Sequence, residues 1–419
     1  MTIKLNQKNL LKNGLILCVM LGTVLLAAND SYALGFLIPN QDAFAIGRGN
    51  AFVATADNPS AIYYNPAGIT QIPNNDLQVG DLNYLGLNVE YHSPVGAEAN
   101  TKFEIIPIPQ LFYTLTPTNL ALPFSFGLGV YAPFGLGVKW PENSIMRPQA
   151  IDSRLYYFTV NPVVAYKFLD SLSVAVGPTF NYSKIGFNRG LASASDYFEF
   201  KGDDFAYGLT AGILWQPIQE LSFGVDYKLA TTMHYSGTST YNVGGGGPTF
   251  QLPTSARVPF PQTISGGVSY RPTPKWNVEV DVDYIDWHTL GDVTLNGTAP
   301  VFAQNLVLHL NWHDSFQYKA GVTRYFDNGW YASCGYFFST DTTDSADYTA
   351  AVPDSNLHVG SIGIGRDCEH WHWALSGQLI AGSRKVDAAP GNTINPVDTS
   401  AGTYAFFVPA VSVSVGYRF

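Results

Sequence analysis

Hydrophobic and polar residues alternate along most of the chain from about residue 76 to its end. In 276–284 every second residue is large and apolar, and the residues between are asparagine or acidic. The segments 205–215 and 221–229 repeat this pattern. The chain ends with apolar residues at alternate positions: Val411, Val413, Val415, Tyr417 and Phe419. A period of two indicates strands whose two faces meet different surroundings.

The interruptions between these segments are alternately short and long. The short turns are 116–119, 169–170, 216–220, 271–275, 327–328 and 368–369. The long loops, rich in Gly, Pro, Asp, Ser and Thr, are 92–104, 132–153, 188–202, 236–261, 289–311, 340–356 and 383–403. Fourteen strands are predicted: 76–91, 105–115, 122–131, 155–168, 171–187, 203–215, 221–235, 262–270, 276–288, 312–326, 330–339, 357–367, 371–382 and 404–419. Short turns at one end and long loops at the other are typical of outer-membrane barrels, whose short turns face the periplasm.

Composition supports a barrel wall rather than membrane helices or a soluble sheet. Mean hydropathy is near zero (+0.03), charged residues are scarce (13%) and aromatic residues are abundant (14%). A helical membrane protein needs apolar runs of about 20 residues, and only the N-terminus has one. A soluble sandwich or propeller is the alternative, but aromatic residues gather near segment ends, as in interfacial girdles. We predict an all-β fold, a transmembrane antiparallel β-barrel spanning 76–419.

The N-terminus predicts export. Lysines at positions 4, 8 and 12 precede an apolar stretch, and small residues around position 33 suit a cleavage site. Residues 1–33 are therefore expected to be a signal peptide, cleaved after Ala33, with an uncleaved anchor helix as the alternative. Cys18 lies inside the apolar run, so lipidation is not expected. The two remaining cysteines, Cys334 and Cys368, are expected to lie too far apart in height to pair.

Charge limits the partners. The formal net charge is −10, and removal of 1–33 takes away three lysines and one aspartate, which leaves −12. An acidic protein is a poor partner for nucleic acid, so no nucleic-acid binding is expected.

Residues 34–75 do not follow the strand pattern. This stretch is rich in Gly and Pro with short apolar patches, precedes the first strand and is too small for a stable separate domain. A fourteen-stranded wall leaves a lumen wide enough to need filling if the pore is not open. We predict that 34–75 forms a hatch that plugs the barrel from inside.

Several short motifs occur in the order found in a known family. They are Leu34-Gly35-Phe36, Tyr63-Tyr64-Asn65-Pro66-Ala67-Gly68, Ala132-Pro133-Phe134-Gly135-Leu136, Asn161-Pro162, Tyr166-Lys167, Tyr270-Arg271-Pro272, Asp283-Tyr284-Ile285-Asp286-Trp287 and Val352-Pro353-Asp354-Ser355. The mature chain thereby resembles the FadL/TodX family of outer-membrane transporters for long-chain fatty acids and other hydrophobic compounds. Leu34 stands where a small residue would be expected, which affects only the position of the cleavage site.

The resemblance implies lateral diffusion as the mechanism. Ligand would be caught among extracellular loops, pass into a lumen pocket and leave sideways through a gap at a kinked third strand. Gly35 and Phe36 would be the N-terminal ligand contacts, and Asn65, Pro66 and Ala67 the hatch motif.

The kink of the third strand is assigned to Pro133, Phe134 and Gly135, because proline cannot donate to a ladder and glycine permits a bulge. The alternative is that Pro133 only begins a loop. The Asn65 amide is predicted to bond strand backbone left unpaired at this kink. An ordinary Asn-Pro turn is the alternative for that motif, and plain hatch packing is the alternative for Phe36.

Loop residues offer further candidate contacts. Apolar candidates are Trp140, Ile145, Met146, Phe250 and Leu252, which alternatively pack on one another. Candidate partners for a carboxylate are Arg147, Arg154 and Lys319, although the acidic residues of strand 276–288 favour an internal ion pair for Lys319. The histidines His309, His313, His370 and His372 are not expected to converge, so neither a metal nor a cofactor is predicted.

The predicted function is transport of hydrophobic molecules across the outer membrane, with long-chain fatty acids the leading substrate. Aromatic or aliphatic hydrocarbons are the alternative cargo, and an outer-membrane lipid-acting enzyme or a porin the alternative class. No Ser/His/Asp set converges in the predicted topology, so no enzyme is expected. Other expected partners are outer-membrane lipid including lipopolysaccharide, and the barrel-assembly machinery through the C-terminal Phe419. A monomer is expected.

Overall fold

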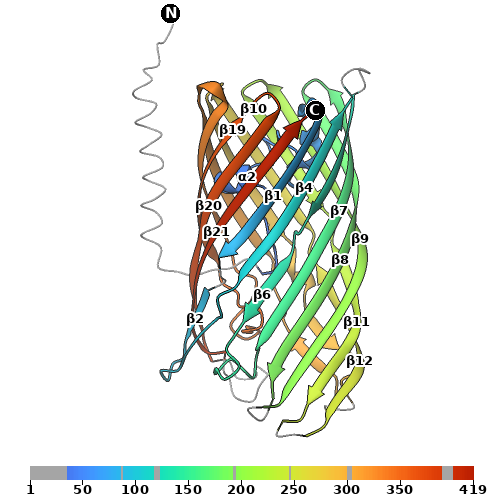
Figure 1. The fold of residues 1–419 in the computed structure, drawn as a ribbon, viewed down its shortest axis with the longest axis vertical. Coiled ribbons are helices and arrows are strands. Elements are labelled where there is room, and N and C mark those ends of the chain that lie inside the picture. The colour runs from blue at the N-terminus through green and yellow to red at the C-terminus, as the bar shows by residue number, and fades with distance from the viewer. Residues whose placement is uncertain are drawn as a thin grey trace, which may run out of the picture.

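The computed structural model describes residues 35–419, apart from 86–87, 118–122, 192–194, 245–246, 300–303 and 389–399. Nearly all of the described strands form one antiparallel sheet that closes on itself (Figure 1). The predicted signal peptide and its cleavage site lie outside the described residues. Within the described part, no helix is long and apolar enough to cross a membrane.

The barrel wall has fourteen strand positions, as predicted. In order they are β1 (Asn74–Leu85) with β2 (Asn88–His92), β4 (Ile105–Thr116), β5 (Phe124–Tyr131) with β6 (Gly135–Lys139), β7 (Asp152–Leu169), β8 (Leu172–Gly190), β9 (Tyr197–Ile218), β10 (Leu221–Lys228) with β11 (Thr231–Asn242), β12 (Thr249–Phe260) with β13 (Thr263–Thr273), β14 (Trp276–Ile285), β17 (Ser315–Tyr325), β18 (Trp330–Ser339), β19 (Leu357–Asp367), β20 (Trp371–Val386) and β21 (Gly402–Arg418). The barrel closes where β1 pairs with β21, from Asp76↔Arg418 to Tyr84↔Ala410.

Smaller elements lie outside the wall. Beyond its end are the short strand β3 (Glu98–Asn100), which pairs with β2, and the hairpin of β15 (Asp292–Leu295) and β16 (Leu306–His309). Two 3-10 turns, η3 (Trp287–Thr289) and η4 (Asp327–Gly329), follow β14 and β17. Cys334 and Cys368 are thiols rather than a disulfide.

The two faces of the wall differ as the alternation predicted. On β14, Val280 and Val282 are 54% and 39% exposed on the outer face, whereas Glu279 and Asp281 are buried inside. The predicted loop 236–261 is wrong, because β11 and β12 pair in register from Thr231↔Phe260 to Asn242↔Thr249. Its Thr, Ser and Gly residues indicated a loop, but hydrogen bonds between neighbouring strands hold most of them in the ladder of β11 and β12.

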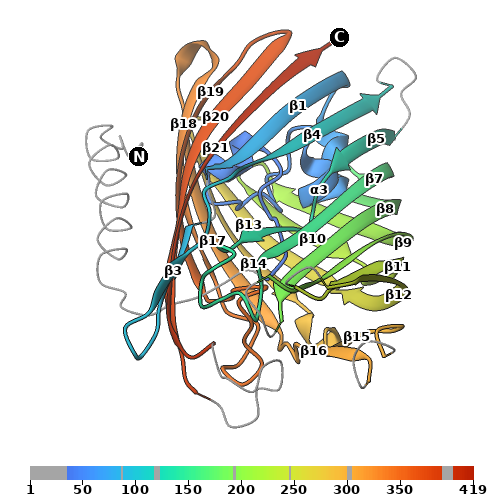
Figure 2. The same cartoon turned by 60° about the horizontal axis from the view of Figure 1, so that its bottom comes forward.

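The segment before β1 lies inside the barrel (Figure 2). It contains the short helices α2 (Ala43–Gly47) and α3 (Ala61–Tyr64) and the 3-10 turn η1 (Pro66–Gln71). Frequent Gly and Pro keep each piece to about one turn. Nearly all of its residues from Phe36 to Ile69 are buried, and its apolar side chains pack against inward-facing wall residues such as Phe112 and Val163.

Carboxylates of β14 hold this segment in place. Asp281 Oδ2 accepts hydrogen bonds from the backbone N–H groups of Phe52 (2.7 Å) and Val53 (3.0 Å). Glu279 Oε1 accepts from the N–H groups of Ala54 (2.6 Å) and Thr55 (3.2 Å). Four successive amides that have no helical or strand partner are thereby satisfied by two buried carboxylates, as in the anion-binding nests of irregular backbone.

The buried charge of Glu279 is balanced by Arg48, whose Nη2 lies 3.2 Å from Glu279 Oε2, and both side chains are fully buried. Glycines of the wall allow the backbone around Arg48 to approach closely. A Cβ at Gly335 would lie 2.0 Å from the Arg48 carbonyl carbon, and one at Gly321 would lie 2.2 Å from its carbonyl oxygen. The hatch and the wall are therefore fitted backbone to backbone.

We expect Gly335→Ala to displace the segment around Arg48 at a cost of about 1–3 kcal/mol, because the added methyl group overlaps backbone. The barrel should still form, which heat-modifiable migration on a gel measures. Single-channel conductance in a planar bilayer should rise as the plug loosens. The matched control is Gly377→Ala, since a Cβ at Gly377 meets nothing within 4 Å. Equal conductance of the two variants would contradict the close fit.

Candidate functional site

The third strand of the wall is interrupted, and this interruption opens a gap. β5 pairs with β4 only from Leu111↔Val130 to Leu115↔Phe126, whereas β6 pairs with β7 alone. β4 continues for six residues, 105–110, with β1 on one side and no ladder on the other. The wall is therefore open between this part of β4 and β6.

Prolines blunt the exposed edge of β4. Pro107 and Pro109 lie within the stretch that pairs with β1. Because proline has no N–H, a regular ladder with β1 places the two proline nitrogens on the side of the gap. The edge of the gap thus has fewer unsatisfied donors than an ordinary strand edge would leave in lipid.

The first described residues of the hatch complete the backbone of the kink. The Ile38 N–H donates to the Pro133 carbonyl (2.8 Å), and the Gly135 N–H donates to the Phe36 carbonyl (2.9 Å). The Gln41 side-chain amide donates to the Ala132 carbonyl (2.8 Å). The hatch therefore acts as a short strand laid on the break between β5 and β6, so Pro133 interrupts a strand position rather than only beginning a loop.

The prediction that the Asn65 amide bonds this kink is wrong. Asn65 Nδ2 donates to the carbonyl oxygens of Val53 (2.8 Å) and Ile213 (3.0 Å), and Ile213 belongs to β9. A Cβ at Gly212 would lie 2.3 Å from Asn65 Oδ1 and 2.9 Å from Pro66 Cδ. Asn65, Pro66 and the buried Ala67 thus dock against β9, because glycine at 212 leaves room for them there.

An apolar cavity of about 190 Å³ passes through the gap. Its lining includes the buried Ile38 and Leu155, and also Tyr156 and Phe158, which are 48% and 41% exposed on the outer face. Pro107, Pro109, Phe134 and Gly135 also line it. The cavity therefore joins the interior of the barrel to its outer surface.

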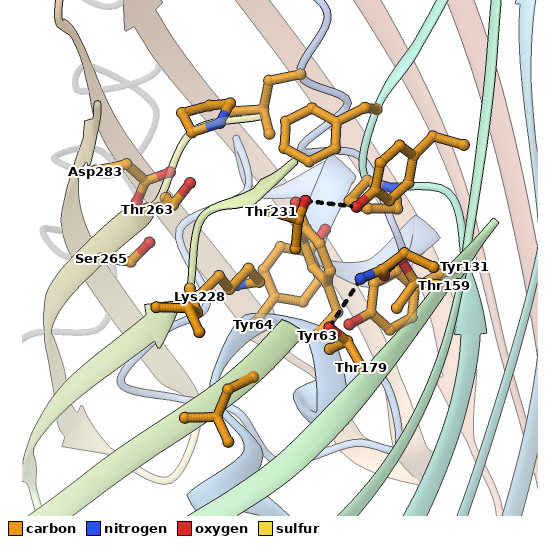
Figure 3. Close-up of a pocket in the computed structure, with 18 of the residues that line it drawn as sticks. Tyr63, Tyr64, Tyr131, Thr159, Thr179, Lys228, Thr231, Thr263, Ser265 and Asp283 are labelled. Atoms are coloured by element: carbon orange, nitrogen blue, oxygen red, sulfur yellow. Dashed lines mark hydrogen bonds between the residues drawn. The ribbon is translucent and has the colours of Figure 1, made fainter. Parts of the chain in front are cut away.

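A second apolar cavity of about 80 Å³ lies next to the first and shares Leu136, Arg154 and Leu155 with it. Phe36, Phe187, Phe260 and residues of the 340–356 loop also line it. A third cavity of about 60 Å³ lies beside Tyr63 and Tyr64 of the hatch (Figure 3). Its lining is more polar and includes Lys228, Asp283 and several threonines.

Aromatic rings enclose Phe36. Its ring centroid lies 4.8 Å from that of Trp312 and 5.7 Å from that of Trp287. The preceding Gly35 N–H donates to Asp354 Oδ1 (3.3 Å). Gly35 has a φ of +57° and a Cβ there would lie 2.8 Å from the Trp312 ring, so glycine is needed on both counts. Phe36 thus links the rings of Trp287 and Trp312 to the short hatch strand that hydrogen-bonds to the kink.

The predicted apolar loop contacts lie elsewhere. Trp140 and Met146 are fully buried, and the Trp140 indole N–H donates to the Ala350 carbonyl (2.9 Å). Ile145 is partly buried and packs against the same core. Phe250 and Leu252 lie on β12. None of the five lines any of the three cavities described above. Packing among loops explains Trp140, Ile145 and Met146, whereas Phe250 is 45% exposed on its strand.

The three candidate cations differ. Arg154 lines both apolar cavities and is paired with Glu104 and, at 2.6 Å, with Asp152. Arg147 binds loop backbone at Asp196 and Glu142. Lys319 is paired inside the barrel with Asp283, which confirms the internal ion pair that the sequence favoured.

Sequence reasoning missed several lining residues, notably Ile38, Ile106 and Leu155. One signal was available: Pro107 and Pro109 inside an otherwise regular strand predict an unpaired edge. No local pattern could have placed Trp312 beside Phe36, because 276 residues separate the two.

Comparisons with known proteins agree with this fold. The model of the family "Outer membrane protein transport protein (OMPP1/FadL/TodX)" matches residues 24–371. A long-chain fatty acid transport protein of Escherichia coli O6:H1 is 21% identical, over 81% of this chain and 85% of its own. A FadL homologue of Pseudomonas aeruginosa superposes with a TM-score of 0.75 at 17% identity, over 92% of this chain and all of that one.

The toluene transporter TodX of Pseudomonas putida has a TM-score of 0.70 at 16% identity, over 93% of this chain and all of that one. These structures share the fold. The fold and the gap define the class as a transport barrel of the bacterial outer membrane. The chain belongs to the OMPP1/FadL/TodX family of outer-membrane transport proteins.

The loop that holds Gly35 should respond to pH. Burial raises the pKa of Asp354 to about 6, so this carboxyl binds a proton more readily in the folded loop than in an unfolded one. This higher proton affinity stabilises the folded loop. The stabilisation is fully present below about pH 4 and is lost as pH rises through about 6. Amide exchange at Thr342, whose N–H donates to Asp354 Oδ2, should therefore be better protected at about pH 5 than at about pH 7.5 after correction for intrinsic rates. Asp354→Asn should remove this difference, and protection that increases with pH would contradict the assignment.

Proposed function

We propose that the protein carries hydrophobic molecules across the outer membrane by lateral diffusion through the gap between β4 and β6. The observation that supports this proposal best is the apolar cavity that reaches from Ile38 and Leu155 inside the barrel to Tyr156 and Phe158 on its outer face. A polar solute would gain no free energy by moving from water into this cavity. A hydrocarbon chain gains roughly 0.8 kcal/mol for each methylene group removed from water.

The proposed route begins among the loops. Ligand enters the small cavity beside Phe36 and displaces that ring from Trp287 and Trp312. The strand formed by residues 36–38 then shifts, which releases the backbone of the kink and widens the passage past Leu136. The ligand leaves sideways into the membrane and never crosses a water-filled pore. In this route Gly35 and Phe36 sense the ligand, and Pro133, Phe134 and Gly135 form the gate.

Long-chain fatty acid is the proposed cargo, with its chain in the apolar cavities and its carboxylate at Arg154. A specific observation favours the alternative of uncharged hydrocarbons: Arg154 is already neutralised by Glu104 and Asp152. A fatty acid carboxylate must compete with these two acids, whereas an alkane or monoaromatic need not.

Further assignments complete the proposal. Residues 1–33 serve as the signal peptide, 34–75 as the hatch and 76–419 as the barrel. Phe419, whose side chain is exposed, is the residue offered to the assembly machinery, and the protein functions as a monomer among lipid and lipopolysaccharide. The three described cavities are lined by no histidine, so they hold no Ser–His pair of the kind that activates a serine nucleophile. Absence of lipid hydrolysis by purified protein tests that part.

Filling the gap should stop transport. A Cβ at Gly137 would lie 2.6 Å from Ile106 Cδ1 across the gap, so Gly137→Trp places an indole in the passage. We expect oleate uptake to fall to background in cells that lack another fatty acid transporter, with the amount of folded barrel unchanged. The control is Gly377→Trp on β20, which faces open space and should transport normally. Full uptake by the Gly137 variant would refute the lateral route.

The role of Arg154 distinguishes the two cargoes. Arg154→Met should weaken binding of oleate to purified protein by about 1.5–3 kcal/mol, the contribution of a hydrogen bond to a charged group. Glu104→Gln should strengthen it, because one competing carboxylate is removed. Toluene binding should change in neither variant. Arg147→Met, outside the cavities, is the control. If oleate binding is the same in the Arg154 and Glu104 variants as in the control, the cargo carboxylate is not held by Arg154.

A further inference from the structure

Three side chains with metal-binding atoms converge at the loop end of the barrel, outside the cavities. His288 Nδ1 lies 2.6 Å from Asp286 Oδ1 and 2.8 Å from Asp314 Oδ1, and all three atoms lie within 4.8 Å of one another. Asp286 and His288 flank Trp287 at the end of β14, whereas Asp314 directly precedes β17. Two separate segments therefore present one imidazole nitrogen and two carboxylate oxygens to the same point.

The remaining atoms of the carboxylates are held by neighbours. Asp286 Oδ2 accepts from the Gln262 side-chain amide (2.7 Å), and Asp314 Oδ2 accepts from the Tyr284 hydroxyl (2.8 Å). Supporting bonds of this kind orient metal ligands in proteins, because they fix the oxygen that is left to face the ion. Here they leave Oδ1 of each aspartate directed at His288.

Protein hydrogen bonds satisfy only part of this arrangement, since Asp314 Oδ1 accepts from the His288 backbone N–H (3.2 Å) but Asp286 Oδ1 has no such donor. Nδ1 of His288 carries at most one hydrogen, but two carboxylate oxygens face it. The Asp286 side chain is only 8% exposed, and its Oδ1 is buried without a hydrogen-bond partner. The His288 side chain is 63% exposed, so an ion can reach the site from water.

We propose that Asp286, His288 and Asp314 bind a divalent transition-metal ion, with zinc as the representative. One imidazole nitrogen and two carboxylate oxygens suit zinc, which takes three protein ligands and a water at open sites. Calcium and magnesium prefer sites made wholly of oxygen. Zinc bonds of about 2.0–2.1 Å place tetrahedral ligand atoms roughly 3.3 Å apart, so small side-chain rotations admit the ion.

The ion would tie together the two segments that enclose Phe36. Trp287 lies between two of the ligands, and Trp312 lies two residues before the third. The Trp312 N–H already donates to the Leu290 carbonyl (3.0 Å), and the Leu290 N–H donates to that of Trp287 (2.9 Å). A metal ion bound to both segments would cross-link them, so these hydrogen bonds would break less often. The site itself does not depend on which cargo the protein carries.

The test is calorimetric titration of the full-length protein in detergent micelles with zinc chloride. Serine replaces all three cysteines, Cys18, Cys334 and Cys368, in the background protein, since thiols also bind zinc. We expect one zinc ion per chain, with affinity reduced at least roughly tenfold by His288→Ala and, separately, by Asp314→Asn. The matched control is His309→Ala, because His309 faces the single carboxylate of Asp292 at 2.7 Å. That variant should bind as the background protein does.

A second measurement keeps the proposal testable if one variant folds poorly. Zinc should slow hydrogen exchange at the Leu290 and Trp312 amides in the background protein and leave it unchanged in the His288 variant. Absence of zinc binding overturns the proposal, as does zinc binding that both ligand variants retain. Binding of calcium but not of zinc overturns it too, since that selectivity contradicts the imidazole ligand.

Discussion

The structure depends on one requirement: backbone groups in a membrane-embedded wall must have hydrogen-bond partners. The break between β5 and β6 leaves such groups without a neighbouring strand, and lipid cannot supply partners. Two features of this protein meet the requirement. Prolines on the edge of β4 have no N–H that needs a partner, and residues of the hatch hydrogen-bond to the kink as a short strand. The hydrogen bonds of Ile38 and Phe36 with the kink therefore make the hatch part of the wall, so a movement of one requires a movement of the other.

The hatch can serve in this way only if the rest of it stays in place. Glu279 and Asp281 accept four successive amides of residues 52–55, and Asn65 fixes η1 to β9. Both contacts lie away from the kink. Burying a carboxylate costs free energy unless its charge is paired or hydrogen-bonded. Arg48 and the four amides provide these partners. Two parts of the hatch are thus held differently. Carboxylates hold its middle, whereas backbone hydrogen bonds and aromatic contacts hold its first residues.

The sequence predicted the barrel well, because a strand with lipid on one face and lumen on the other carries an unambiguous period of two. Val280 and Glu279 could be assigned to opposite faces from that period alone. The break at Pro133 was expected for a different reason, the family resemblance together with the backbone chemistry of proline and glycine. The partner of Asn65, the position of Phe250 and the convergence of Asp314 with Asp286 could not be predicted, since each depends on contacts between segments far apart in the chain. Their correct placement needs the closed register of the barrel.

In the proposed route, ligand and gate are linked through Phe36. A ligand shifts an equilibrium only as far as it binds one state better than the other. The closed state places Phe36 against Trp287 and Trp312, and the same residue accepts the hydrogen bond from Gly135 that covers the kink. A molecule that occupies the Phe36 position removes those ring contacts from the closed state alone. Each aromatic pair contributes about 0.5–1.5 kcal/mol, which is comparable to a single backbone hydrogen bond. In the proposed route, a ligand that takes the place of the Phe36 ring thus removes from the closed state a stabilisation comparable to that of a hydrogen bond at the kink. The route therefore favours apolar ligands with enough surface to replace Phe36.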